Sequence, residues 1–427
     1  MGRKQSGYPL LDIGRAFCDY RPFHIEDTVG GVVYQLDAER VTNRTVHLLY
    51  ACVFLLTGLG LVTLYSASYA FADRFFRNSH HFIFRQLWFG GAGIILFFIS
   101  SRINLEHLRK IILPLVILAA ILCALTLVPG IGVERHGASR WIRIGENTYQ
   151  PSEMVKLVLP LYLAHIFDKK KESINSFASG ILPPLLITGV FFGLIYAQNN
   201  FSTAVFIALN ALILFFLAGL HYRYFISAIV IFIPSAGLLL FTAEHRIRRV
   251  LSFLHPEWDP LGAGFQVRSS LLTIISGGLW GQGIGQGTRK IASVPEIHSD
   301  FIFSAFAEET GFVGVLLFFA LFAFFAALGY RTAWRSTSTF RFLLAAGMTT
   351  MLVSQMLLNI AVVSGALPAT GIPLPFFSAG GSSLITSLIC AGFIVNVARN
   401  VGKNDGLHDT GYAARYAGFN LEGQDVR

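Results

Sequence analysis

Long apolar stretches alternate with short polar segments along most of the 427-residue chain. Ten of these stretches approach the length of about 20 apolar residues that a helix needs to cross a bilayer. They lie near 46–67, 82–100, 110–128, 152–167, 177–197, 201–219, 222–241, 304–328, 341–363 and 382–398. The pattern predicts an all-α, polytopic integral membrane protein with ten transmembrane helices.

The same pattern divides the chain into one membrane domain and two polar tails. The predicted domain of ten helices covers 45–399, and the tails cover 1–44 and 400–427. The longest polar interruption, 242–303, predicts a large extracytoplasmic loop between the seventh and eighth helices. Composition agrees, because only 13% of the residues are charged, whereas a soluble domain has about 25%.

The basic residues predict the orientation in the membrane. An even number of spans puts both termini on one side, and the segments on that side hold most of the 33 Lys and Arg residues. Because short basic loops stay in the cytoplasm, both termini are expected there. Two basic groups remain on the outer side, and together they favour binding of an anion over solvated loop charges. These are Arg135, Arg140 and Arg143 after the third span, and Arg246, Arg248, Arg249, Arg268, Arg289 and Lys290 in the large loop.

The segment HPEWDPLGAGFQVRSS at 255–270 combines acids with helix-breaking prolines and glycines. An irregular backbone at membrane depth must be buried in protein or line a watery cavity. Asp259 is therefore a candidate general base and Gln266 a candidate substrate contact, although a turn residue is the alternative for Asp259, since Asp-Pro favours turns. The apolar segment that follows, SLLTIISGGLW, is too short to span and predicts a re-entrant or interface-lying helix.

The glycine-rich run GQGIGQGTRK at 281–290 resembles a nucleotide-binding loop only superficially. Gln286 stands where a dinucleotide fingerprint has its third glycine, and Thr288 stands where a P-loop has its lysine. A flexible or closely packed loop is the better interpretation.

Three more segments put polar residues at the outer ends of spans. Glu153 and Lys156 share one helix face and form either a functional pair or a structural ion pair. Gly380 to Ser383 would present backbone N–H groups to an anion or form a tight packing turn, with Ser382 and Ser383 as the candidate contacts. His298 and Asp300 are candidate substrate contacts, and together with Glu308 and Glu309 they are expected to cap or orient rather than to react.

These segments together resemble the SEDS family, the shape, elongation, division and sporulation proteins of the FtsW, RodA and SpoVE type. The resemblance covers about residues 45–400, and the glycine-rich loop and GFQV favour the division and sporulation branch. The matching stretches are RWIRIGENTYQPSEMVKL, RVLSFLHPEWDPLGAGFQVRSSL, SGGLWGQGIGQGTRK, PEIHSDFIFSAFAEETGFVG and TGIPLPFFSAGGSS.

The resemblance implies a peptidoglycan glycosyltransferase of the bacterial cytoplasmic membrane, which polymerises lipid II on its outer face. It also implies a class B penicillin-binding protein as partner, beside other divisome or elongasome membrane proteins and membrane lipid, and no nucleic acid. The family's essential acid is matched to Asp259, and its characteristic charged residues are matched to Arg140, Glu153, Lys156 and Arg249. The chain departs from the family at QNNFSTA, where Asn200 replaces an acid, and at SAGGSS, where Ala379 replaces an aromatic residue.

The chemistry of chain growth needs one base and several cations. A carboxylate takes the proton of the attacking sugar 4-hydroxyl, and cations stabilise the departing pyrophosphate, for which Arg140, Lys156, Arg246 and Arg249 are candidates. A single displacement inverts the anomeric carbon. A divalent cation, Mg²⁺ or Mn²⁺, would be compatible, although no ligand cluster with metal spacing is visible. The alternatives are a lipid II flippase, which should carry charges along the whole path, and a scaffold that only recruits a transpeptidase.

Overall fold

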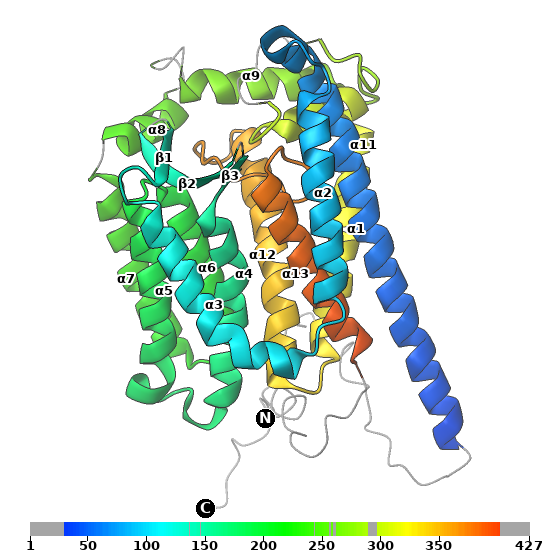
Figure 1. Cartoon of the computed structure of the whole chain (residues 1–427), viewed down its shortest axis with the longest axis vertical. Helices are drawn as coiled ribbons and strands as arrows, with labels where there is room; N and C mark the ends of the chain where they lie inside the picture. Colours follow the sequence, from blue (N-terminus) through cyan, green and yellow to red (C-terminus); the bar gives the residue numbers. More distant parts are fainter. Residues whose placement is uncertain are drawn as a thin grey trace, which may run out of the picture.

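The computed structural model describes residues 30–135, 137–145, 147–242, 244–255, 258, 262–288 and 297–401. Its long helices run side by side, and α8, α9 and a small sheet lie together at one end of the bundle (Figure 1). This end is called the α9 end below. Most of the two predicted tails, and Asp259 with the acid-bearing part of its loop, lie outside the described residues.

Every predicted span overlaps one long helix of the described chain. The short helices α8 and α9 cover Glu244–Leu254 and Ala263–Ser276, and a 3₁₀ turn (Lys171–Ser173) and a π turn (Phe177–Ile181) precede α5. The long helices are α1 (Gly30–Phe76), α2 (His81–Ser100), α3 (Leu105–Leu125), α4 (Pro151–Lys169), α5 (Leu182–Ala197), α6 (Phe201–Leu217), α7 (Tyr222–Leu240), α11 (Ile302–Trp334), α12 (Thr339–Val363) and α13 (Gly381–Arg399).

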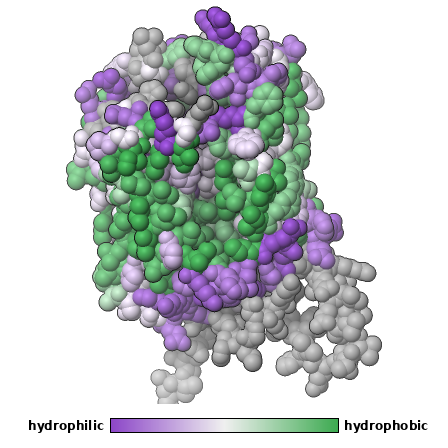
Figure 2. All heavy atoms as spheres, viewed as in Figure 1, coloured by the Kyte–Doolittle hydropathy of each residue, from purple (hydrophilic) through white to green (hydrophobic). Residues whose placement is uncertain are grey.

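Seven helices in the described part of the chain are long and apolar enough to cross a membrane. They include α1, α2, α3, α11, α12, α13 and α5 with its preceding π turn. The predicted spans that do not meet these criteria include α4 and α6. The apolar run of α4 is interrupted by the charged residues Glu153, Lys156 and Asp168, and α6 has only 17 residues. Apolar side chains cover the middle of the molecule and hydrophilic ones both ends, as a bilayer requires (Figure 2). The protein is thus a multi-helix membrane protein, and the count of ten spans stays a prediction.

The segment between α3 and α4 forms a small antiparallel sheet, for which the sequence analysis predicted no structure. Its strands β1 (Gly132–Arg135), β2 (Ala138–Ile144) and β3 (Asn147–Tyr149) pair in chain order. The helix α4 begins directly after β3, with Pro151 in its first turn, where the missing N–H costs no hydrogen bond. The sheet therefore fixes the entry of α4 and places Arg140 at the α9 end.

The glycine-rich loop packs against a break in α11. Gly311 has a φ of 65°, which interrupts the helix. The N–H groups of Phe312 and Val313 donate there to the carbonyls of Gly278 (2.9 Å) and Leu279 (3.2 Å). A Cβ on Gly311 would lie 2.2 Å from the backbone nitrogen of Gly281, so only glycine permits this approach. The closely packed alternative predicted for this loop is therefore confirmed.

The acids Glu308 and Glu309 serve the same junction. Both are buried, at 0% and 4% exposure. An oxygen of Glu309 accepts from the N–H of Gly285 at 3.0 Å and from the hydroxyl of Ser66 on α1. The backbone carbonyls of the two acids accept from Gln282 and Gly283. These contacts orient the loop, in agreement with the role expected for these acids.

Candidate active site

A cavity of about 1190 Å³ lies at the α9 end. Its wall comes from five separate parts of the chain: the start of α2, the sheet, α8 with the start of α9, the segment 298–301, and the loop 369–383. Seven of the predicted site residues line it. They are Arg140, Arg249, Gln266, His298, Asp300, Ser382 and Ser383.

Arg140 enters the cavity from β2 and is held by the turn between α5 and α6. Its Nη2 donates to the carbonyl of Asn199, whose side chain donates in turn to the carbonyl of Gly137 at 2.9 Å. Its Nε is buried and has no acceptor within the described residues. Burial and, to a smaller extent, the charge of Arg249 lower the pKa of Arg140 to about 10, whereas Asp300 opposes both effects. The charged form of Arg140 is therefore less favourable here than in water.

Arg249 approaches from α8, and Asp300 from the segment before α11. Although the Arg249 side chain is exposed at the cavity wall, desolvation by the surrounding protein lowers its pKa, and Asp300 opposes this effect too. Asp300 thus lies close enough to act on both guanidinium groups. Two cations and one acid leave an excess of positive charge among these three, which suits an anionic ligand.

The backbone around Asp300 is fixed on two sides. Its carbonyl accepts from the Asn359 amide at 2.8 Å. Two residues earlier, the carbonyl of His298 accepts from the N–H of Ala379 at 2.9 Å, and the His298 ring packs on Phe82 with ring centroids 4.4 Å apart. A Cβ on Gly371 would lie 3.3 Å from Asp300 Oδ2, so the carboxyl group faces the loop 369–383. The described structure thus places a carboxylate inside the cavity.

Ser382 and Ser383 lie in the first turn of α13, close to the predicted helix start. Gly380 is the N-cap residue, and no side chain accepts a hydrogen bond from the first backbone N–H groups of the helix. A Cβ on Gly381 would lie within 2.6 Å of the Phe89 ring. The glycine therefore lets the helix end approach α2 at the cavity wall.

Glu153 and Lys156 are buried in the bundle and do not line the cavity. Lys156 Nζ lies 2.7 Å from Glu153 Oε1, and the side chains are only 1% and 3% exposed. The ammonium also donates to Gln355 Oε1 at 3.4 Å. The ion pair that the sequence analysis named as the alternative is present, and a direct contact of Lys156 with substrate stays a prediction.

Arg246 also lies away from the cavity wall. It is 7% exposed, and its Nη1 donates to Tyr196 Oη (2.8 Å), to the Leu239 carbonyl (2.9 Å) and to Thr242 Oγ1 (3.1 Å). Its guanidinium packs 4.4 Å from the centroid of the Tyr196 ring. Arg246 thus ties α8 to the ends of α5 and α7.

Comparison with known proteins decides the family. The model of the FtsW, RodA and SpoVE family, described as cell cycle proteins, matches residues 46–403. The chain belongs to this family.

Two relatives in this family are similar to the chain along most of their own length. The chain is 38% identical over 344 residues to the probable peptidoglycan glycosyltransferase FtsW of Geobacter sp. (strain M18), covering 81% of this chain and 94% of that protein. It is 37% identical over 352 residues to stage V sporulation protein E of Bacillus subtilis (strain 168), covering 82% and 96%.

Two solved structures have the same architecture. One belongs to a peptidoglycan synthase complex that coordinates polymerization and crosslinking, with a TM-score of 0.68 and 29% identity over 83% of this chain and 98% of that one. The other is the rod shape determining protein RodA of Thermus thermophilus, with a TM-score of 0.62 and 27% identity over 83% and 97%. The RodA-like arrangement of helices therefore holds for this family member.

Some residues of this SEDS protein's site were missed in the sequence analysis. Gln86 on α2 lines the cavity and donates to the carbonyl of Ser378 at 3.0 Å. Gln355 and Asn359 lie one turn apart on α12, on one helix face. Polar side chains inside otherwise apolar spans are costly, and that cost was a usable signal for all three.

Proposed function

We propose that the protein is a peptidoglycan glycosyltransferase that polymerises lipid II at the outer face of the bacterial cytoplasmic membrane. The observation that carries the proposal is the convergence of Arg140, Arg249 and Asp300 on one large cavity at the end of a membrane helix bundle. A base and an anion-binding group are what this transfer needs. The names of the similar FtsW proteins support the same activity.

The proposed topology has ten spans, with both termini in the cytoplasm. The distribution of Lys and Arg supports this orientation. It puts the α9 end outside, because the sheet and α8 follow odd-numbered spans. The cavity then meets the membrane surface where a lipid-linked sugar emerges, and the undecaprenyl chain stays in the bilayer between helices.

The proposed reaction is one displacement. The 4-hydroxyl oxygen of one sugar bonds to the anomeric carbon of the other, and the bond from that carbon to the pyrophosphate oxygen breaks with inversion. The hydroxyl proton passes to a carboxylate. Undecaprenyl pyrophosphate leaves with the electron pair, and Arg140 and Arg249 stabilise its charge.

Two carboxylates compete for the role of base. Asp300 is one candidate, because it lies in the cavity within range of both arginines. Asp259, matched from the family resemblance, lies outside the described residues and stays a prediction. Among the described residues, no three His, Cys, Asp or Glu are grouped as metal ligands. We assign no step to a divalent cation.

A class B penicillin-binding protein is the proposed partner. The supporting observation is the likeness to a chain of a peptidoglycan synthase complex, in which polymerization and crosslinking are coordinated. Other divisome or elongasome membrane proteins would join them. The similarity to FtsW proteins and to stage V sporulation protein E favours a role in division or sporulation.

The purified chain in vesicles with fluorescent lipid II tests the proposal against its rivals. A glycosyltransferase converts lipid II to glycan strands that separate on a gel. A flippase instead moves the label across the bilayer without polymer, and a scaffold does neither. Absence of polymer, both with the chain alone and with its transpeptidase partner added, would reject the proposal.

A further inference from the structure

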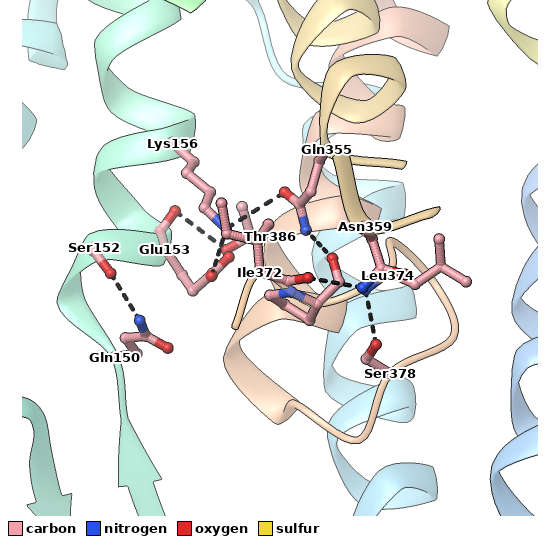
Figure 3. A network of polar contacts seen from close by, with 11 residues as sticks. Gln150, Ser152, Glu153, Lys156, Gln355, Asn359, Ile372, Leu374, Ser378 and Thr386 are labelled. Atoms are coloured by element: carbon pink, nitrogen blue, oxygen red, sulfur yellow. Dashed lines mark hydrogen bonds and ion pairs between the residues drawn. The ribbon is translucent and has the colours of Figure 1, made fainter. Parts of the chain in front are cut away.

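The helix α12 carries two buried amides that contact the segments forming the cavity wall on the side away from the cavity. Gln355 and Asn359 are 3% and 1% exposed, and neither lines the cavity. Figure 3 shows both side chains directed at the chain segment between Ile372 and Ser378. A buried amide without hydrogen bonds is costly inside a membrane bundle. The groups that bond to these two amides therefore indicate their role.

Asn359 joins two segments of the wall. Its Nδ2 donates to the carbonyl of Asp300 and to the carbonyl of Ile372, each at 2.8 Å. Because the two acceptors belong to different segments, one amide group fixes their separation. The Asp300 carboxyl group and the neighbouring Gly371 face each other across this junction.

Gln355 fixes the same loop one turn away. Its Nε2 donates to the carbonyl of Pro373 at 2.8 Å, and its Oε1 accepts from Lys156 Nζ at 3.4 Å. The cation accepts no hydrogen bond, so it holds the amide with oxygen towards α4 and nitrogen towards the loop. The buried pair of Lys156 and Glu153 thereby sets the orientation of Gln355.

The far side of the loop is fixed as well. Ser378 Oγ accepts from the N–H of Leu374 at 2.8 Å, and the Ser378 carbonyl accepts from Gln86 Nε2 at 3.0 Å. The loop is therefore tied to α2, α12 and the segment before α11. The position of this wall relative to Asp300 therefore depends on the hydrogen bonds of the α12 amides.

We propose that Asn359 and Gln355 are positioning residues for glycosyl transfer, which hold Asp300 and the Gly371–Pro373 wall at a fixed separation and orientation. The inference rests on the proposed function. It assigns the Lys156–Glu153 pair an indirect role, through Gln355. A displacement of about 1 Å in a reacting geometry can cost about 10²-fold in rate. Loss of either amide should therefore lower kcat, with KM little changed.

Asn359→Leu and Gln355→Met test this in the full chain, with fluorescent lipid II as substrate. Both replacements keep a side chain of similar length and remove the hydrogen-bond donor. The matched control is Asn396→Leu on α13. Asn396 is fully buried, and its Nδ2 donates to the carbonyls of Ser100 (2.8 Å) and Ile103 (2.7 Å), far from the cavity.

The expected result is a kcat lower by up to about 10²-fold for Asn359→Leu, and a smaller loss for Gln355→Met. Hydrogen exchange should rise in 297–301 and 370–378 in both variants. Asn396→Leu should lower Tm by a similar amount and leave kcat and that exchange unchanged. Gln355→Met still decides the matter should Asn359→Leu not fold.

Wild-type kcat in a folded Asn359→Leu or Gln355→Met protein would overturn the inference while the proposed function stood. An equal loss of kcat in Asn396→Leu would do the same, because the effect would then follow stability alone. A wild-type protein that makes no polymer overturns the proposed function and the inference with it.

Discussion

Arg140 on β2 and Arg249 on α8 line one cavity, where burial and then the charge of Arg249 lower the pKa of Arg140. Like charges in such a place are unfavourable unless an anion joins them, and Asp300 offsets them only in part. The relationship connects two segments more than a hundred residues apart. We expect an anion, such as the pyrophosphate of the proposed substrate lipid II, to relieve the repulsion between the two cations.

Inorganic pyrophosphate should therefore raise the Tm of the wild-type protein. Binding at 100 times Kd stabilises the folded state by about 2.7 kcal/mol. The lowered pKa of Arg140, about 10, means that the empty site binds its proton less tightly than a free arginine does. Arg140 is still charged below pH 10, so the shift should persist at neutral pH and decrease as pH rises through about 10. Thermal unfolding with and without pyrophosphate measures this.

Arg140→Met should abolish most of that thermal shift, and Arg249→Lys should retain part of it, because charge remains while the fork of donors is lost. Arg74→Met is the control, since Arg74 is exposed in the last turn of α1 and does not line the cavity. A full pyrophosphate shift in Arg140→Met would show that the anion binds elsewhere.

Asp300→Asn should fold normally and lose polymerisation by about 10²-fold or more. The fold should survive because the Asn359 contact uses the backbone carbonyl of residue 300. Glu244→Gln is the control, since Glu244 is the other acid that lines the cavity in the described structure, and it is exposed and paired with Arg248. Rates of glycan formation compare the two, with Asp259→Asn measured beside them. Near wild-type activity in Asp300→Asn combined with loss in Asp259→Asn would transfer the base to residue 259.

The sequence predicted the helices well and the site only in part. Apolar runs bounded by Pro, Gly and charges determine where a chain can cross a bilayer, so each predicted span coincides with a long helix. The meeting of Arg140, Arg249 and Asp300 has no such periodic pattern, because it depends on how a strand, a short helix and a loop come together at one end of the bundle. The motif around Asp259 assigned the role of base to that residue, and this stays a prediction because Asp259 lies outside the described residues. Asp300 was noted as an orienting group. The amides of α12 showed a polar pair one turn apart, but their partners are backbone carbonyls, which no sequence reveals.

Topology can be tested with introduced cysteines. Ser139→Cys on β2 should react from outside with an impermeant thiol reagent, and Ser173→Cys in the 3₁₀ turn only after lysis. The native Cys52, Cys123 and Cys390 are buried, which keeps background labelling low. The fourth cysteine, Cys18, is changed to Ser for this experiment. Ser293→Cys would extend the test to the large loop, outside the described residues. Labelling of Ser173→Cys in intact cells would invert the proposed orientation.

A double-mutant cycle on Glu153 and Lys156 separates three roles for the buried pair. Breaking a buried ion pair by removing one partner costs about 3–5 kcal/mol, because the other charge is left uncompensated. Glu153→Gln and Lys156→Met should each lower the Tm strongly, and the double mutant should regain much of it.

Activity in the stable double mutant then decides between the roles. A merely structural pair predicts recovery of both kcat and KM. A substrate contact through Lys156 predicts a raised KM. Positioning through Gln355 predicts a lowered kcat at nearly constant KM, because the amide loses the cation that orients it. We expect the third pattern, and recovery of kcat together with stability would contradict it.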